Sequence, residues 1–525
     1  MPKKIAILGA GPSGLVAAKE ALQNGLIPTI FERESDIGGV WSPSGAVWNT
    51  MHTNISKFTT SFGDFHWPPD AEMFPSAAAM LNYLNEYASR WNVRDYVKFN
   101  SKVVKVSAMN NKSEDVGLNG WTVQWIENDS SVQTDSFEGV IVATGIFSKA
   151  HIPQDIPGLD SFRGKAIHSK EYRSGEIFAG MRTLTVGGSF SGAEIASDVS
   201  NHASVSYHCF REPFWILKRH LPDKKSGRKS LPLDLLFYTR SFYQLTTTTA
   251  SVDESSTSKN KYMASICEEQ QIIPELSIDP QHFNRPYYVT VSDKYLHQVE
   301  QKTLVPIRQP ISEISGSTVR FRNGDTLDVD AIIFCTGYNP ELNFLDNDIL
   351  QKILYDQTDR LQPVILFKEC CHPDVKNMFF VGMYKGPYFS VIEQQARFAA
   401  RVLSGRVSSP NATAMSEGLK IEETIRNTHP RQQFPHPEYV LFADEISQCA
   451  GSFPNLQKFR KSSCTLADAF GVPLKEDALH LEQQKSELYE RFMSEPVTPS
   501  HYNLVHDPVA TINRMDVVKE IIAKM

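Results

Sequence analysis

The chain of 525 residues is too long for a single hydrophobic core, so at least two domains are expected. Its 41% hydrophobic and 22% charged residues are typical of a soluble globular protein, and the net charge of -7 argues against nucleic acid as a partner. No apolar run reaches the ~18 residues that a membrane-spanning helix requires. The seven cysteines include no CxxC pair, which indicates a reduced, cytoplasmic protein.

The first forty residues predict a dinucleotide-binding unit. Residues 5–8 and 27–31 are apolar runs of strand length, and residues 15–22 have the apolar face of a helix. The turn after the first strand is rich in glycine, and we assign all its residues to cofactor binding: Gly9, Ala10, Gly11, Pro12, Ser13 and Gly14. Glycines at these spacings allow a tight turn, a close approach of the backbone to a pyrophosphate, and close packing of the helix on the strand. Glu32 follows the second strand, where a carboxylate can accept hydrogen bonds from a ribose diol.

A second unit of the same kind begins at residue 183. The strand at residues 183–186 leads into the turn at residues 187–192, in which Ser189 replaces the middle glycine; serine is small enough to keep the turn, and its hydroxyl can bind a phosphate. The partner strand ends at Arg211, where NAD-binding units carry an acid. A guanidinium at this position suits a 2′-phosphate and favours NADPH over NADH. The residues assigned to this cofactor are Ser189, Phe190, Ser191, Gly192, Ala193, Glu194 and Arg211.

The rest of the chain alternates regular elements with a polar insertion. Apolar patterns predict helices at residues 76–91 and 390–405, and strands at residues 97–106, 121–126, 139–145, 330–338 and 377–382. An Asn-Gly turn predicts a hairpin within residues 318–327. Residues 220–298 form the expected insertion, with polar, mobile segments at residues 224–229 and 246–260. Roughly the last 110 residues are expected to be mostly helical.

Three segments resemble the flavin-containing monooxygenases. Residues 31–41, which end in Gly-Gly-Val-Trp, resemble the FAD-binding N-terminus of that family, and residues 53–55 resemble its active-site loop. Residues 162–172 match the pattern FxGxxxHxxxY, which is similar to the family fingerprint. Within this pattern we expect His168 to order a domain junction rather than to act as a base. The motifs follow the family order from residue 5 to about residue 405, roughly three quarters of the chain.

The resemblance implies an α/β fold with two dinucleotide-binding, Rossmann-like domains, the NADP-binding domain being inserted into the FAD-binding domain. The expected boundaries are 1–160 for the first part of the FAD-binding domain, 161–330 for the NADP-binding domain, and 331–525 for the second part with its helical C-terminal region. The resemblance also implies a further set of cofactor-binding residues: Gly39, Val40, Trp41, Thr53, Asn54, Ile55, Val103, Thr144, Gly145, Thr336, Gly337 and Gln395.

The activity that the resemblance implies is NADPH- and O2-dependent oxygenation of a soft nitrogen or sulfur nucleophile through a C4a-hydroperoxyflavin. Asn54 is the catalytic residue expected beside the flavin, and neither a protein nucleophile nor a metal is required. The expected partners are a small-molecule nucleophile and O2, with a homodimer left open.

Three alternatives are weighed. A Baeyer–Villiger ketone monooxygenase shares the scaffold, but such relatives usually carry tryptophan at the position of Tyr172. A pyridine-nucleotide disulfide reductase needs a redox cysteine pair that the sequence lacks. A flavin-binding regulatory protein without turnover would not need intact motifs in both nucleotide units.

Overall fold

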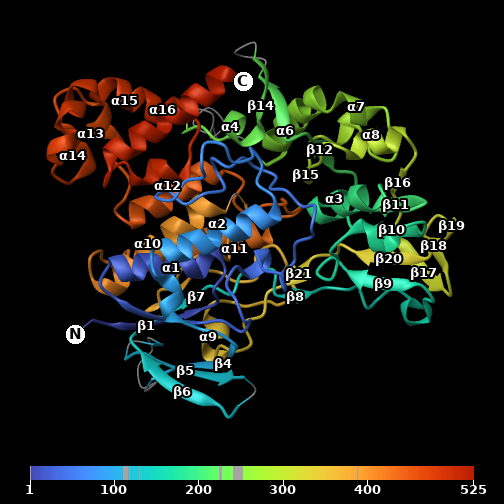
Figure 1. The fold of residues 1–525 in the computed structure, drawn as a ribbon, viewed down its shortest axis with the longest axis horizontal. Helices are drawn as coiled ribbons and strands as arrows, with labels where there is room; N and C mark the ends of the chain where they lie inside the picture. The colour runs from blue at the N-terminus through green and yellow to red at the C-terminus, as the bar shows by residue number, and fades with distance from the viewer. Residues whose placement is uncertain are drawn as a thin grey trace.

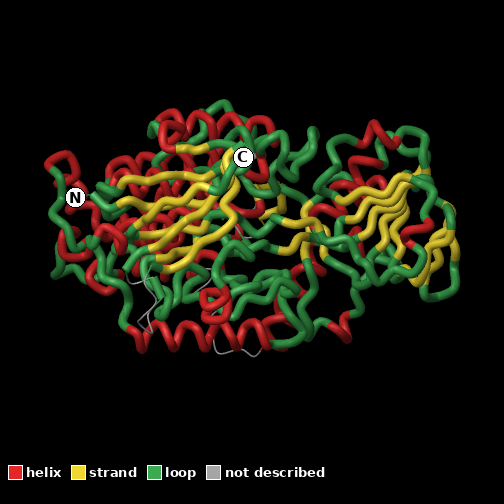
Figure 2. Tube along the Cα trace, turned by 90° about the horizontal axis from the view of Figure 1, so that it is seen from below, coloured by secondary structure: helices red, strands yellow, loops and turns green. Residues whose placement is uncertain are grey.

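Two parallel five-stranded sheets organise the chain, and each carries one of the two glycine motifs. The described residues of this computed structural model are 2–109, 116–117, 119–128, 130–223, 228–240, 252–386 and 388–525. The first sheet has the order β22-β7-β1-β2-β3, with β1 (Lys4–Leu8), β2 (Ile27–Phe31), β3 (Val97–Lys98), β7 (Gly139–Val142) and β22 (Met378–Phe380). The second has the order β16-β11-β10-β20-β9, with β9 (Lys165–His168), β10 (Arg182–Val186), β11 (Val205–Cys209), β16 (Leu304–Ile307) and β20 (Ala331–Phe334). Figure 2 shows the two sheets as separate groups of strands, and the second lies on the right in Figure 1.

The first sheet is buried on both faces, which explains why its strands are continuous apolar runs. In β1, Ile5 and Ile7 belong to the core that includes α1 (Pro12–Gln23) and α10 (Phe389–Ser404). Ala6 and Leu8 point the other way, into a core shared with a three-stranded antiparallel sheet. That sheet consists of β4 (Ser101–Ala108), β5 (Trp121–Glu127) and β6 (Gln133–Phe137), and it covers the lower face of the first sheet in Figure 1.

The two expected units have the predicted order of elements. In the first, α1 connects β1 to β2; in the second, α3 (Phe190–Val199) connects β10 to β11, and both strand pairs are parallel. The helices expected at residues 76–91 and 390–405 are confirmed as α2 (Ala77–Arg90) and α10. The Asn-Gly hairpin is confirmed as β18 (Thr318–Phe321) and β19 (Thr326–Asp328), which pair with β17 (Ile311–Ser315).

One expected strand is wrong in its bounds, and the expected domain boundaries stay a prediction. The single strand expected at residues 97–106 is split into β3 and β4, because Asn100 has a positive φ of 50° that no continuous strand accommodates. The expected domain boundary after residue 330 falls directly before β20, which lies between β10 and β9 in the second sheet. The chain therefore leaves the second sheet only after Phe334, through a short ladder of β21 (Tyr338–Asn339) with β8 (Lys149–Ala150).

The expected insertion, residues 220–298, is more regular than its composition indicates. It contains β13 (His220–Asp223), β14 (Arg228–Pro232), α4 (Leu233–Phe237), α6 (Val252–Ile266), α7 (Glu268–Gln271), β15 (Val289–Val291) and α8 (Tyr295–Glu300), with β15 pairing with β12 (Trp215–Leu217). The mobile run expected at residues 246–260 is wrong from residue 252 onward, because α6 buries Asn260. Asn260 accepts a hydrogen bond from Trp215 Nε1 at 2.8 Å and donates one to the Phe283 carbonyl at 2.8 Å. The remaining parts of the two expected mobile segments, residues 224–227 and 246–251, lie outside the described residues, whereas residues 228–229 belong to β14.

The C-terminal region is helical, as expected. Beyond α9 (Asn347–Lys352), its helices are α11 (Ala412–Asn427), α12 (Tyr439–Cys449), α13 (Leu456–Arg460), α14 (Leu466–Phe470), α15 (Lys485–Ser494) and α16 (Pro508–Lys524). Helices α12 to α16 gather at the upper left of Figure 1, beside α10. None of the helices in the described part of the chain combines the length and the apolar character needed to cross a membrane.

Candidate cofactor and active site

One cavity of about 1470 Å³ connects the carboxyl ends of β1, β2 and β7 with the N-terminus of α3 and with α4 and α6. The expected site residues that line it are Gly9, Gly11, Pro12, Ser13, Glu32, Gly39, Val40, Trp41, Thr53, Asn54, Ile55, Val103, Thr144, Gly145, Ser189 and Phe190. The expected residues that do not line it are Ala10, Gly14, Ser191, Gly192, Ala193, Glu194, Arg211, Thr336, Gly337 and Gln395. Most of the cofactor-binding residues expected in the first unit, and the first two expected in the second unit, therefore line one cavity.

The glycines of the first motif have distinct steric tasks. A Cβ on Gly14 would lie 1.9 Å from the Gly9 carbonyl oxygen, so this glycine lets α1 pack on β1 and does not face the cavity. Gly9 has a positive φ of 105° and turns the chain at the end of β1. A Cβ on Gly39 would lie 2.9 Å from the Gly11 Cα, so the backbone of the Gly38-Gly39 segment touches the motif directly.

Both glycine motifs lead into helices that lack a side-chain cap. Gly11 is the N-cap of α1 and Ser189 is the N-cap of α3, and neither donates or accepts a capping hydrogen bond through a side chain. By contrast, Ser76 caps α2 by accepting a hydrogen bond from Ala79 N. The uncapped N–H groups and the positive end of each helix dipole can bind a phosphate at the cavity wall.

Glu32 is fixed in place beside the first motif. Its Oε2 accepts a hydrogen bond from Ala10 N at 2.7 Å, and its Oε1 accepts one from Glu34 N at 2.9 Å. Burial raises the pKa of the carboxyl, and the two backbone donors oppose that rise. Ala10 does not face the cavity itself. Its backbone N–H helps to orient the glutamate that does.

Two neighbouring residues at the end of β7 fit a bound cofactor. Thr144 lines the cavity, and its buried hydroxyl has no hydrogen-bond partner among the described residues. Gly145 has a positive φ of 68°, and no atom lies within 4 Å of the position where a Cβ would stand. An unsatisfied buried hydroxyl beside open space is costly unless a ligand supplies the missing hydrogen bond.

The second motif repeats the packing of the first. A Cβ on Gly192 would lie 1.7 Å from the Gly187 carbonyl oxygen, the counterpart of the contact between Gly14 and Gly9. Ser191, Gly192 and Ala193 lie inside α3, away from the cavity, whereas Ser189 and Phe190 face it. Arg211 is exposed directly after β11 and outside the cavity wall. Its role toward a 2′-phosphate stays a prediction.

Asn54 is held by an arginine that no sequence motif indicated. Arg219 donates from Nη2 to Asn54 Oδ1 at 3.4 Å and from Nε to the Thr53 carbonyl at 3.0 Å. The same guanidinium forms ion pairs with Glu194 and Asp293, each at 3.0 Å. Because the amide oxygen of Asn54 faces Arg219, the Nδ2 group is the part of the side chain that can donate to a ligand. Glu194 thus acts on the site through Arg219 rather than on the cofactor directly.

His168 joins the two domains, as expected from the sequence. Its Nε2 donates to the Gly337 carbonyl at 3.0 Å, and its Nδ1 accepts from Lys170 N at 3.1 Å. Burial lowers the pKa of His168 to about 4, so the ring is neutral at ordinary pH. The Thr336 hydroxyl donates to the His151 carbonyl in the same crossover. Thr336 and Gly337 therefore support the junction and lie away from the cavity.

Gln395 lies in the predicted helix but on its buried side. Its Oε1 accepts a hydrogen bond from Gly382 N at 3.0 Å, and its Nε2 donates to the carbonyls of Lys368 and Glu369. The start of α10 reaches the cavity instead, through Tyr388 and Phe389. The helix was predictable from its periodicity, but which residue faces the ligand depends on long-range packing.

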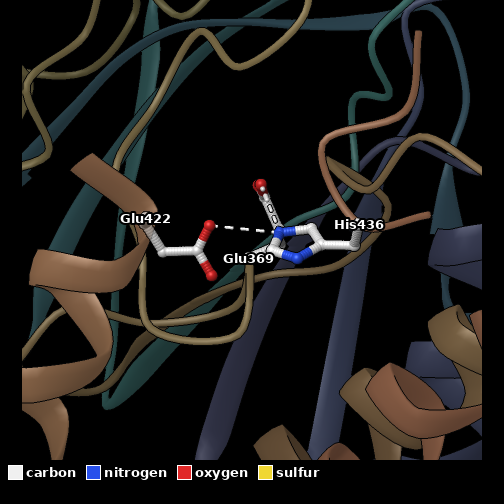
Figure 3. A group of neighbouring side chains, drawn as sticks. All are labelled: Glu369, Glu422 and His436. Atoms are coloured by element: carbon white, nitrogen blue, oxygen red, sulfur yellow. Dashed lines mark ion pairs between the residues drawn. The ribbon is translucent and has the colours of Figure 1, made fainter. Parts of the chain in front are cut away.

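A buried cluster of one imidazole and two carboxylates lies behind the cavity wall. His436 lines the cavity and points its Nε2 toward Glu422 Oε2 at 3.1 Å and Glu369 Oε1 at 3.4 Å (Figure 3). Burial alone would lower the pKa of His436, but the two carboxylates outweigh it and raise the pKa to about 9. The three groups lie close enough together for a divalent cation. When its ring is protonated, His436 forms ion pairs with both carboxylates.

Comparisons with known proteins agree with this geometry. Residues 2–472 match the family model described as flavin-binding monooxygenase-like. Dimethylaniline monooxygenase (N-oxide-forming) 2 of Mus musculus is 29% identical over 486 residues, covering 87% of this chain and 84% of the relative. The structure of S-allyl-L-cysteine S-oxygenase from Allium sativum shares the fold, with a TM-score of 0.61, 20% identity, and coverage of 100% of this chain and 99% of that one.

A third similar structure is that of cyclohexanone monooxygenase from Rhodococcus sp. Phi1 bound to NADP+. It has a TM-score of 0.61 and 15% identity, and covers 85% of this chain and 97% of that one. At this identity the likeness concerns the fold, whereas the family match extends over both nucleotide units and most of the C-terminal region. The chain belongs to the flavin-binding monooxygenase-like family.

Proposed function

We propose that the protein uses FAD, NADPH and O2 to oxygenate a soft nitrogen or sulfur nucleophile. The observation that carries this proposal is the single cavity that runs from the first glycine motif, past Asn54, to the N-terminus of α3. FAD, when bound, supplies the redox chemistry: it takes electrons from NADPH and activates O2. The family match and the two uncapped helix N-termini support this assignment.

The residues of the chain bind and orient the cofactors. The N-terminus of α1 and the Gly11 backbone would hold the FAD pyrophosphate, and Glu32 would accept hydrogen bonds from the adenosine ribose. Val103 lines the same end of the cavity, near the expected adenine, and Val40 and Trp41 line the part expected to hold the flavin. Thr144 would donate the hydrogen bond that its hydroxyl lacks among the described residues.

The second unit would bind NADPH at the N-terminus of α3, with Ser189 and Phe190 in the wall and Arg211 toward the 2′-phosphate. Asn54 lies between the two units and offers its Nδ2 group to the reacting centre. The wall from α4 and α6 is mainly apolar and would exclude water from that centre.

The experiment is a cofactor and turnover assay on purified protein. We expect a yellow protein with one FAD per chain that consumes NADPH and forms an N-oxide or a sulfoxide from amine and thioether probes, with the product identified by mass spectrometry. Colourless, folded protein that takes up no FAD would contradict the proposal. NADPH oxidation that yields only hydrogen peroxide with every probe would also contradict the oxygenase assignment.

Ketone oxygenation is the second candidate, because one similar fold is that of a cyclohexanone monooxygenase. Incubation with cyclohexanone and NADPH distinguishes the two, since a lactone product would favour the Baeyer–Villiger assignment. Tyr172 favours oxygenation of nitrogen or sulfur, because Baeyer–Villiger relatives usually carry tryptophan at this position. Tyr172 does not line the cavity. Its hydroxyl donates a hydrogen bond to Asp198 Oδ2 at 2.5 Å, so its role is structural.

A further inference from the structure

One acidic residue of the insertion is buried against the loop that carries Asn54. Asp234 in α4 is 0% exposed, and its carboxylate accepts three hydrogen bonds from that loop. Its Oδ1 accepts one from Ser56 N at 3.0 Å. Its Oδ2 accepts one from Ser56 Oγ at 2.6 Å and one from Thr59 Oγ1 at 2.7 Å. Ser56 and Thr59 are also buried, so bulk water does not compete for these hydrogen bonds.

The hydrogen bonds of Asp234 are directed at this loop alone. A buried carboxylate gives up its hydration, whereas an apolar side chain could fill the same space without that cost. An ionised carboxylate offers only acceptors, so it can be stabilised here only by donors in fixed places. In the described part of the chain, every hydrogen bond that Asp234 accepts from another element comes from residues 56–59. The acid is therefore matched to the loop.

The loop is held on both sides of Asn54. Before it, Arg219 Nε donates a hydrogen bond to the Thr53 carbonyl at 3.0 Å. After it, Ser56 donates two hydrogen bonds to Asp234. The contact of Asn54 itself with Arg219 is long, at 3.4 Å, so that contact alone holds the side chain weakly. The direction in which Asn54 points therefore depends on both anchors.

Both anchors belong to one structural unit. Arg219 directly precedes β13, Asp234 lies in the helix that directly follows β14, and these two strands pair antiparallel. Leu233 N donates a hydrogen bond to the Arg219 carbonyl at 3.0 Å, which joins the two anchor segments directly. Leu233 and Leu236 of the same helix line the cavity. The unit that forms part of the apolar wall therefore also fixes the loop that carries Asn54.

We infer that Asp234 is a positioning residue, which holds Asn54 at the flavin by fixing residues 56–59. This inference rests on the proposed function, in which the Nδ2 group of Asn54 donates to the reacting centre. Asp234 does not line the cavity, so it acts through the loop rather than on a ligand. A catalytic group that is displaced by about 1 Å can lose about 100-fold in rate. Loss of Asp234 should therefore resemble loss of Asn54.

The experiment measures how the FAD-loaded protein divides NADPH between sulfoxide and hydrogen peroxide, with methyl phenyl sulfide as the probe. Asp234→Leu removes the acceptors and should lower the ratio of sulfoxide to peroxide about 10- to 100-fold. Asp234→Asn can keep the geometry, because its Oδ1 can accept from Ser56 N and its Nδ2 can donate to the two hydroxyl groups. Its ratio should stay within about threefold of the wild-type ratio.

A double-mutant cycle with Asn54→Ala tests whether Asp234 acts through Asn54. In the Asn54→Ala background, Asp234→Leu should change the ratio of sulfoxide to peroxide less than about twofold. The same cycle is measured on the visible circular dichroism of the bound FAD, which needs no turnover. Asp234→Leu should change that signal when Asn54 is present and leave it unchanged in the Asn54→Ala background.

Two further variants separate positioning from stability. Gln270 in α7 is a buried residue outside the cavity wall, and its side chain makes three hydrogen bonds to backbone groups. Gln270→Leu should lower the unfolding midpoint and keep the wild-type ratio. Thr59→Val removes one donor to Asp234 with little change of shape and should lower the ratio severalfold. Thr59→Val carries the test if Asp234→Leu does not fold.

Several outcomes would overturn the inference. One is a wild-type ratio in folded Asp234→Leu or in Thr59→Val, and another is a pair of independent, multiplying effects of Asp234→Leu and Asn54→Ala. An Asp234→Asn variant as impaired as Asp234→Leu would assign the effect to the charge, and an equally impaired Gln270→Leu would assign it to lost stability. If no oxygenated product forms but the flavin signal follows the expected cycle, the inference stands and the proposed function fails.

Discussion

Arg219 Nη2 and Glu194 Oε2 form an ion pair at 3.0 Å that connects the two nucleotide units. Glu194 lies on α3 of the second unit, while the same guanidinium contacts Thr53 and Asn54 of the first. Both side chains are mostly buried, with 11% and 17% of their surface exposed. The position of the active-site loop is therefore coupled to the helix that would bind NADPH.

Replacing Arg219 with methionine should loosen this coupling. The change leaves Glu194 without its partner in a mostly buried place, which should lower the free energy of unfolding by about 2–3 kcal/mol. Urea denaturation followed by circular dichroism measures the loss. The control is Lys218→Met, whose ion pair with Glu269 is exposed and should contribute less than about 1 kcal/mol. Equal losses in the two variants would mean that the Arg219 network contributes no more to stability than an exposed ion pair.

Arg211 should decide between NADPH and NADH. Arg211→Ala removes the guanidinium expected at the 2′-phosphate and should reduce the preference for NADPH about 10- to 100-fold in kcat/KM, because a charge-assisted hydrogen bond is lost. Steady-state kinetics with both nucleotides measures the ratio. Arg322→Ala, an exposed arginine between β18 and β19, is the control and should keep the wild-type ratio. A wild-type ratio in Arg211→Ala would refute the assignment.

The cluster around His436 predicts a specific dependence of stability on pH. Because the folded-state pKa is raised to about 9 from an unfolded value of 6.5, the stabilisation is complete below pH 6.5 and is lost as pH rises through 9. A shift of this size corresponds to about 3–3.5 kcal/mol. Burial raises the pKa of the neighbouring Glu369 to about 7, so part of its titration falls above pH 7 and adds to the loss of stability that His436 causes.

Urea unfolding of the wild type and of His436→Gln at pH 7 and pH 9.5 tests this expectation. The wild type should lose more stability than the variant over this interval, since glutamine cannot titrate. The comparison cancels contributions from other groups that both proteins share. Parallel losses in the two proteins would show that His436 is not protonated in the folded state at pH 7.

The two nucleotide units could be predicted from the sequence because their signals are local. Each consists of a short apolar strand, a glycine turn and a helix, and the close contact that requires Gly14 is with Gly9, only five residues earlier. The position of Glu32 beside the glycine turn was likewise predictable from its place after β2, whereas its role toward a ribose stays a prediction. Gln395 shows the limit: its helix was predictable, but its buried orientation was not.

The remaining parts of the site depend on contacts between distant segments. Arg219 reaches Thr53 across 166 positions of the chain, and Asp234 reaches Ser56 across 178. The polar composition of residues 252–266 did not predict the helix α6. A hydrogen bond between Asn260 and Trp215 helps to set its orientation. Such contacts follow from tertiary packing, so neither periodicity nor motif spacing could indicate Arg219.

Asn54 should control how much of the consumed NADPH yields oxygenated product. Its Nδ2 group is the donor that faces away from Arg219, and loss of one preorganised donor typically reduces kcat about 100-fold or more. Asn54→Ala should still bind FAD and still be reduced by NADPH. Oxygenated product should fall, and hydrogen peroxide released per NADPH should rise; both are measured in the same assay.

A second substitution separates the donor from the structural contact. Asn54→Asp keeps an oxygen that can accept the hydrogen bond from Arg219 but has no N–H group to donate. If the donor matters, Asn54→Asp should lose coupling as severely as Asn54→Ala while its unfolding midpoint stays closer to that of the wild type. If Asn54→Asp instead couples NADPH oxidation to product as well as the wild type does, then Asn54 serves only to hold the loop against Arg219.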